Sequence, residues 1–102
     1  MANAIAFAAL AEPMRVAIVE RLAERPMAVG ELAAGLPVTR PAVSKHLKVL
    51  KDAKLVRDHA VGTRRIYSLD PSGLGPMRMW LDRFWDRALA AYAAAAERED
   101  KP

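Results

Sequence analysis

The feature that most constrains this sequence is the stretch V-T-R-P-A-V-S-K-H-L-K-V-L-K-D-A-K-L-V at residues 38–56. Three apolar residues recur in it at the spacing of one helix face: Val43, Leu47 and Leu50. Side chains so placed would face a core. Thr39 can cap the first turn, and Pro41 is tolerated where N–H groups have no intrahelical partner. The stretch therefore predicts an amphipathic helix at about residues 40–53.

The other side of this predicted helix is polar and basic. It carries Arg40, Ser44, Lys45 and Lys48. Hydroxyl and ammonium groups on a short helix suit the major groove of DNA, where base edges present hydrogen-bond donors and acceptors. A solvated surface helix would have the same pattern, so the stretch alone does not decide between the two.

Positive charge is concentrated around this stretch. Residues 40–65 include eight basic and two acidic side chains, a net charge of +6, whereas the rest of the chain has eight basic and ten acidic side chains, a net charge of −2. A generic solvated surface would mix the two signs. The distribution favours a surface that binds phosphate, and hence nucleic acid.

Further helices are predicted before this stretch. Residues 2–11 and 13–24 carry apolar side chains at helical spacing, and a short helix is expected at 29–36. Ala28 offers this short helix no side-chain cap. Two short helices joined by a tight turn, the second with a polar outer face, form a helix-turn-helix at about residues 29–53.

The periodicity changes after the helix-turn-helix. Alternating runs at 55–60 and 64–69 flank a glycine-containing turn and predict a β-hairpin. Arg64 and Arg65 follow the tip directly. A basic hairpin in this position is a wing, at about residues 55–69, and we expect both arginines to contact DNA phosphates rather than only to solvate a structural hairpin.

A long helix is predicted at residues 76–97, where Gly75-Pro76 restarts helical structure after a short turn at Asp70-Pro71. Its apolar side chains span about half the circumference, more than the ~100° stripe of a helix with one packing surface. A second apolar side left exposed on a monomer is typical of an interface. We therefore expect a homodimer rather than a closed intrachain core or a ligand pocket. Its interface would comprise Phe7 and Leu10 from the first helix and Trp80, Leu81, Phe84, Trp85, Leu89 and Tyr92 from the last.

Composition excludes several classes of protein. The chain has 102 residues, which suits one domain, and no cysteine, which excludes disulfides and thiolate metal ligands. No stretch approaches the ~20 apolar residues of a membrane span, and the start lacks the features of a signal peptide, so we expect a cytoplasmic protein without a membrane partner. The sequence contains no catalytic His/Cys or Ser/His/Asp set and no phosphate loop, so we expect neither an enzyme nor a cofactor.

Taken together, P-A-V-S-K-H-L-K-V-L, G-T-R-R-I-Y-S-L and W-L-D-R-F-W resemble the ArsR/SmtB family of bacterial winged-helix transcriptional regulators. The resemblance covers about Ile5 to Tyr92, and L-A-E-P-M-R-V-A-I at residues 10–18 supports it. It implies a mainly α winged helix-turn-helix, with four helices, a small β-hairpin and a last helix, that binds operator DNA as a homodimer. It places on the recognition helix Thr39, Arg40, Ser44, Lys45, His46 and Lys48, and on the wing Arg64 and Arg65.

The chain departs from the family pattern at two points. Lys54 stands where the family commonly has glycine, and a left-handed backbone there would cost a non-glycine residue ~1 kcal/mol. Metal-sensing members use cysteines, or Asp/His/Glu sets on the last helix. This chain has no cysteine, and its only histidines are His46 and His59, so no metal site is expected. Asp82 and Asp86 should form surface ion pairs instead, and His46 either faces DNA or is structural.

The sequence thus predicts a homodimeric DNA-binding transcriptional regulator, most simply a repressor. It would recognise an inverted-repeat operator through the helix at 40–53 and the wing at 61–65. The alternative is a protein-interaction module that uses the basic face against an acidic partner. The operator, the target genes and the existence of a small-molecule inducer are left open.

Overall fold

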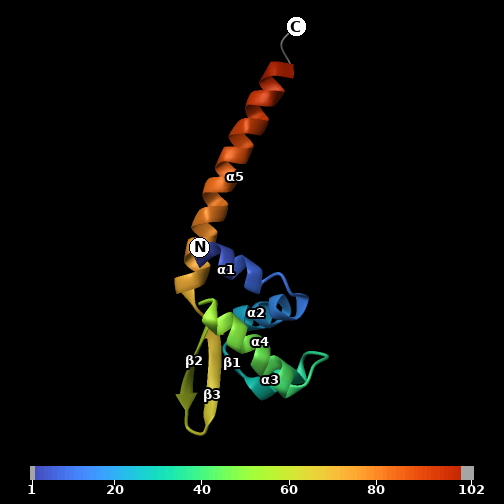
Figure 1. The fold of residues 1–102 in the computed structure, drawn as a ribbon, viewed down its shortest axis with the longest axis vertical. Helices are drawn as coiled ribbons and strands as arrows, with labels where there is room; N and C mark the ends of the chain where they lie inside the picture. Colours follow the sequence, from blue (N-terminus) through green and yellow to red (C-terminus); the bar gives the residue numbers. More distant parts are fainter. Residues whose placement is uncertain (1, 100–102) are drawn as a thin grey trace.

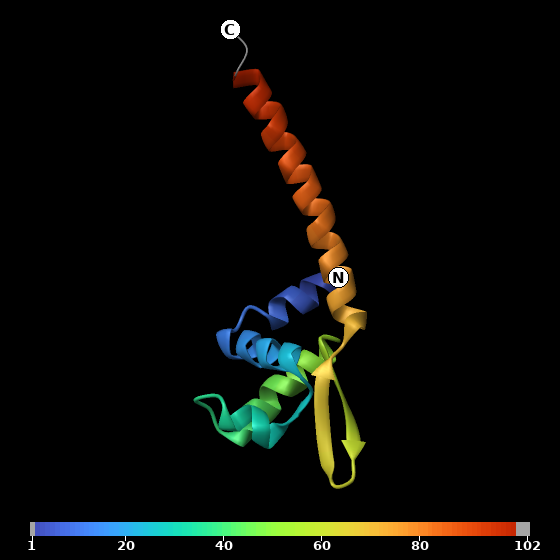
Figure 2. The same cartoon turned by 180° about the vertical axis from the view of Figure 1, so that it is seen from behind.

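The computed structural model describes residues 2–99. Its helices are α1 (Ala2–Ala9), α2 (Pro13–Glu24), α3 (Val29–Ala34), α4 (Arg40–Asp52) and α5 (Pro71–Glu99), and its strands are β1 (Met27–Ala28), β2 (Val56–Val61) and β3 (Arg64–Leu69). The first four helices and the sheet form one packed body. Helix α5 leaves this body and projects away from the β2–β3 hairpin (Figures 1 and 2). The radius of gyration is consequently 18.3 Å, against about 13 Å for a compact chain of this length.

The core lies between α2, α3, α4 and the start of β2. Its fully buried side chains are Ile18, Leu32, Val43, Leu47, Leu50, Leu55 and Val56. The predicted apolar stripe of α4 is therefore confirmed as the buried side of that helix. Since this side is packed against α2 and α3, the opposite side of α4 must face solvent.

Side chains cap both helices of the helix-turn-helix, α3 and α4. The Thr39 hydroxyl accepts a hydrogen bond from the backbone N–H of Ala42 at 3.3 Å, as predicted for α4. At the start of α3, Ala28 has no side-chain acceptor, as expected. The Glu31 carboxylate instead reaches back and accepts a bond from the Ala28 N–H at 3.2 Å. This is one half of a capping box, and it fixes where the Glu31 side chain lies.

The sheet contains a strand that the sequence did not predict. Strand β1 pairs antiparallel with β3, so the strand order is β1-β3-β2, with Met27 opposite Tyr67. A strand of two residues is too short to show an alternating pattern. The β2–β3 pairing runs from Val56 opposite Leu69 to Val61 opposite Arg64, which confirms the predicted hairpin.

Helix α5 is longer than predicted, because it runs unbroken from Pro71 through Pro76. A proline disfavours helical backbone in the residue before it through a clash with that residue's Cβ, and Gly75 has no Cβ. The Asp70 carboxylate also starts the helix, since it accepts a hydrogen bond from the Ser72 N–H at 2.9 Å. The expectation of a restart at Pro76 was therefore wrong.

None of the described helices is long and apolar enough to cross a membrane by itself; only α1 and α2 taken together, as a pair bent by 97°, meet that length and composition.

Helix α4 ends in a tight left-handed turn. Lys54 has a φ of 65°, and the Leu55 N–H donates to the Leu50 carbonyl while the Lys54 N–H donates to the Lys51 carbonyl. These two bonds define a Schellman motif, whose left-handed position usually holds glycine. The first turn of α5 packs on this turn so closely that a Cβ on Gly73 would clash with the Lys54 carbonyl oxygen.

We expect Lys54→Gly to raise the free energy of unfolding by about 1 kcal/mol, because glycine adopts a positive φ without the Cβ clash. Urea unfolding followed by circular dichroism would measure the change. Lys54→Ala is the matched control: it removes the same charge but keeps the Cβ, so it should give no gain. Equal stabilities for the two variants would contradict the strain assigned to this turn.

Candidate nucleic-acid interface

The solvent-facing side of α4 carries a row of polar and basic residues. Arg40, Ser44 and Lys48 follow one another at intervals of four, which places them along one line of the helix, and all three are exposed. Lys45 is exposed beside them. The Lys48 ammonium is 3.2 Å from the Asp52 carboxylate one turn further on. An exposed pair of this spacing is weak, so Lys48 remains available to a ligand.

His46 lies on a different side of α4. It is half-buried, and its Nδ1 is 3.8 Å from the carboxylate of Glu12, the residue that caps α2. Three residues after Val43 and one before Leu47, it borders the packed stripe rather than the exposed row. The geometry therefore favours the structural role among the two that the sequence allowed.

Both wing arginines are held by carboxylates. The Arg64 guanidinium is 2.7 Å from Glu31, and the Arg65 guanidinium is 2.8 Å from Asp58. The concentration of positive charge at residues 40–65 pointed to both arginines, but no sequence pattern pointed to the two acids that bind them. Asp58 was counted only as one of the two acids in the basic segment, and Glu31 lies outside that segment. The sequence offered one sign for Glu31: it stands three residues after the residue that precedes a predicted helix, where a carboxylate can cap the helix.

Asp58 joins the recognition helix to the wing. Its carboxylate receives the Lys51 ammonium from the last turn of α4 at 2.8 Å as well as Arg65 from β3, and its side chain is only 6% exposed. Hydrogen bonding from Lys51, followed by that from Arg65, lowers the pKa of Asp58. The carboxylate is thus ionised at neutral pH and ties α4, β2 and β3 together.

Glu31 is shared among three donors. Its carboxylate accepts from Arg25 at 2.8 Å, from Arg64 at 2.7 Å and from the Ala28 N–H at 3.2 Å. Hydrogen bonding from Arg25, and next from the Ala28 backbone, lowers the pKa of Glu31.

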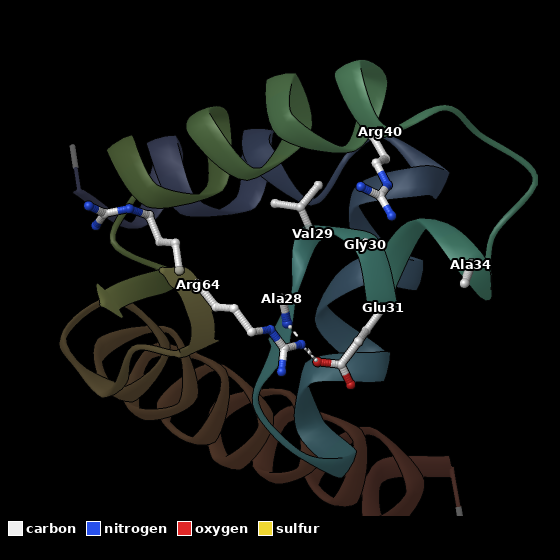
Figure 3. Close-up of a pocket in the computed structure, with 8 residues that line it drawn as sticks. Ala28, Val29, Gly30, Glu31, Ala34, Arg40 and Arg64 are labelled. Carbon is white, nitrogen blue, oxygen red and sulfur yellow. Dashed lines mark hydrogen bonds and ion pairs between the residues drawn. The ribbon is translucent and has the colours of Figure 1, made fainter. Parts of the chain in front are cut away.

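An open cleft of about 550 Å³ separates α3 from the wing. Its lining residues are Ala28, Val29, Gly30, Glu31, Ala34, Arg40, Arg64 and Arg65. In Figure 3 the Arg64 side chain reaches Glu31, while the Arg40 guanidinium lies over Gly30. A Cβ on Gly30 would come within 2.9 Å of that guanidinium. The cleft is thus lined by arginines from α4 and β3, of which Arg64 is bound to Glu31 and Arg65 to Asp58.

The exposed aromatic side of α5 forms the second surface of interest. The predicted residues Trp80, Leu81, Phe84, Trp85, Leu89 and Tyr92 are all exposed, Trp85 by 61% and Tyr92 by 76%. Trp80 stacks on Phe84 with ring centres 5.4 Å apart, and Phe7 of α1 meets the edge of Trp80 at 5.3 Å. Phe7 and Leu10 are only partly buried against the core. Within residues 2–99 this apolar face is therefore left largely exposed, apart from the contact of Phe7 with Trp80.

One of the two aspartates on α5 lies in a surface ion pair. Asp82 lies 3.9 Å from Arg78 in an ion pair, as predicted. Across residues 2–99, no group of three or more histidine, aspartate or glutamate side chains is placed to hold a metal ion.

Known proteins resemble this chain over most of its length. A helix-turn-helix domain family matches residues 10–59. The HTH-type transcriptional regulator Rv2034 of Mycobacterium tuberculosis is 63% identical over 94 residues, which cover 92% of this chain and 88% of that protein.

Two solved structures share the fold. An ArsR-like transcriptional regulator from Rhodococcus sp. RHA1 matches with a TM-score of 0.76 and 35% identity, over 93% of this chain and 92% of that one. The homodimeric winged helix-turn-helix DNA-binding domain of Mb0332 from Mycobacterium bovis matches with a TM-score of 0.68 and 27% identity, over 98% of this chain and 84% of that one.

We expect Asp58→Asn to lower the free energy of unfolding at neutral pH, because Lys51 and Arg65 lose their shared charged partner. The lowered pKa gives this effect a pH dependence. The Asp58 contribution is complete above the unfolded pKa of about 3.8 and is lost as pH falls through the lower folded pKa. The stability difference between wild type and variant should therefore shrink in acid.

Urea unfolding at a series of pH values between about 7 and 2 would test this. Asp52→Asn is the matched control, since Asp52 pairs with Lys48 on the exposed surface and should contribute little at any pH. A difference for Asp58→Asn that stays constant down to pH 2 would contradict the ion-pair role.

Proposed function

The chain belongs to the ArsR/SmtB family of winged-helix transcriptional regulators, and on this basis we propose that it binds operator DNA as a homodimer and represses transcription there. Members of this family are DNA-binding regulators and not enzymes, so the expectation that the chain has no catalytic activity is confirmed. Family membership also favours DNA over an acidic protein as the partner of the basic face.

The observation that carries this proposal is the cleft shared by α4 and the wing. Arg40 is the first residue of the recognition helix α4, and Arg64 and Arg65 are the first two residues of β3. All three line the same cleft. A helix in the major groove and a hairpin beside it would meet one continuous stretch of sugar-phosphate backbone. This arrangement would let the basic residues contact phosphates while the middle of α4 reaches the base edges.

We propose two roles for the exposed polar residues of α4 and the wing. Ser44 and Lys45 are placed to read bases, because they lie in the middle of α4 and carry short or flexible polar groups. Phosphate contacts are proposed for Thr39, Arg40, Lys48, Arg64 and Arg65. His46 would support α4 from its border with α2.

Two copies of the chain would join through the aromatic side of α5. A two-fold dimer presents its recognition helices to an inverted repeat, with half-sites about one helical turn, roughly 34 Å, apart. Since α1 also contacts α5, Phe7 and Leu10 would border this interface.

We expect Arg64→Ala and Arg65→Ala each to weaken binding to operator and to random DNA alike, by roughly fivefold, because a phosphate contact carries no sequence information. Each should also reduce the slope of log K against log salt by about 0.9. Fluorescence anisotropy with a labelled duplex from the chain's own upstream region would measure both. Arg98→Ala, near the end of α5, removes the same charge and should change neither; unchanged salt slopes in both wing variants would refute the wing assignment.

We expect the double variant Phe84→Ala, Trp85→Ala to raise the dimer dissociation constant at least tenfold, because each ring buries enough apolar surface to contribute about 1.5–3 kcal/mol. Analytical ultracentrifugation would measure it. Met79→Ala is the matched control: Met79 is also exposed on α5 but faces the opposite side of the helix. An intact dimer of the double variant at micromolar concentration would contradict the proposed interface.

A further inference from the structure

We propose that Glu31 competes with DNA for the wing: its carboxylate holds the Arg64 guanidinium in the free protein, and a DNA backbone phosphate takes its place in the complex. This inference rests on the proposed function and adds to it a residue that tunes DNA affinity without touching DNA. Because the Glu31 carboxylate is part of the protein itself, every molecule has this competitor for DNA phosphate.

The position of the pair supports an exchange. Glu31 and Arg64 meet inside the cleft that Arg40 and Arg65 also line. In Figure 3 the Arg64 guanidinium reaches Glu31 inside this cleft, so a backbone phosphate that entered the cleft would compete with Glu31 for it. Phosphate and carboxylate offer the same paired oxygen acceptors to a guanidinium, so one can replace the other without a change of donor geometry.

The strength of the pair also fits an exchange. The two side chains are 58% and 31% exposed, and an ion pair so open to water is weak. DNA offers several phosphates to the protein at once, and their binding releases condensed counterions. The Glu31–Arg64 pair is therefore weak enough for DNA to displace Glu31, at a small cost in affinity.

Glu31 would not be left unpaired when Arg64 moves. Its second oxygen remains bound to Arg25 at 2.8 Å, and the Ala28 N–H remains at 3.2 Å. The same contacts keep the carboxylate in place as a cap of α3, so it can bind Arg64 again when DNA dissociates. Asp58 differs, because it is buried beneath Lys51 and Arg65 and acts as a fixed tie.

Glu31→Gln separates charge from shape. Glutamine keeps the length of the side chain and an oxygen that can accept from the Ala28 N–H, but it has no charge to hold Arg64. We expect it to bind both an upstream-region duplex and a random duplex roughly two- to fivefold more tightly, and to steepen the salt slope by up to about 1. Glu31→Asp, which keeps the charge but shortens the reach, should also tighten binding by weakening the contact.

A double-mutant cycle with Arg64→Ala tests whether the effect passes through the pair. Anisotropy titrations between about 50 and 200 mM salt would compare the wild type, the two single variants and the double variant, with thermal unfolding to confirm that each is folded. In the Arg64→Ala background the gain from Glu31→Gln should disappear. Glu20→Gln, which removes one exposed acid from α2, is the matched control and should leave affinity nearly unchanged.

Several results would overturn the inference. Affinity gains from Glu31→Gln that are equal with and without Arg64 would mean that Glu31 acts only through the general field of the protein. Binding no tighter than that of Glu20→Gln, or weaker binding by a folded variant, would remove the competitor role while leaving the proposed function intact. A wild-type chain that binds neither duplex would instead refute the proposed function, and the inference with it.

Discussion

The burial of one side of α4 against α2 and α3 is the constraint on which the rest of this structure depends. Val43, Leu47 and Leu50 are at most 1% exposed, and removing such side chains from water is the dominant stabilising contribution in a small domain. Once this stripe is packed, the rotation of α4 is fixed. The row of Arg40, Ser44 and Lys48 then has only one direction to face, and that direction is outward.

The turn after α4 determines where the next elements, β2 and α5, begin. The positive φ of Lys54 reverses the chain so that Leu55 and Val56 enter the core, and β2 starts beside the helix it follows. The close contact between Gly73 and the Lys54 carbonyl then determines where α5 begins. The helix proposed to read DNA and the helix proposed to form the dimer are thus connected through one short turn, which would set the separation of the two recognition helices.

Charge around the wing is balanced in the free protein. Arg64 and Arg65 face Glu31 and Asp58, and these two acids differ in burial: Asp58 is nearly enclosed, while Glu31 is open to the cleft. A buried carboxylate with two cationic partners stiffens the contact between α4 and the hairpin. An open carboxylate can exchange partners. The hairpin is therefore held against α4 through Asp58, while Arg64 can exchange Glu31 for a phosphate.

The amino-acid sequence by itself determined the helix-turn-helix, the hairpin and the buried stripe of α4, because each depends on local spacing. The left-handed backbone of Lys54 was only raised by the family resemblance, because local sterics disfavour it for lysine. Only the tertiary structure decided the pairing of β1 with β3, the unbroken course of α5 through Pro76 and the surroundings of His46. It also brought Glu31 to Arg64, thirty-three residues away. Such contacts form between segments whose separation along the chain carries no periodic signal, since they depend on how packed elements meet in space.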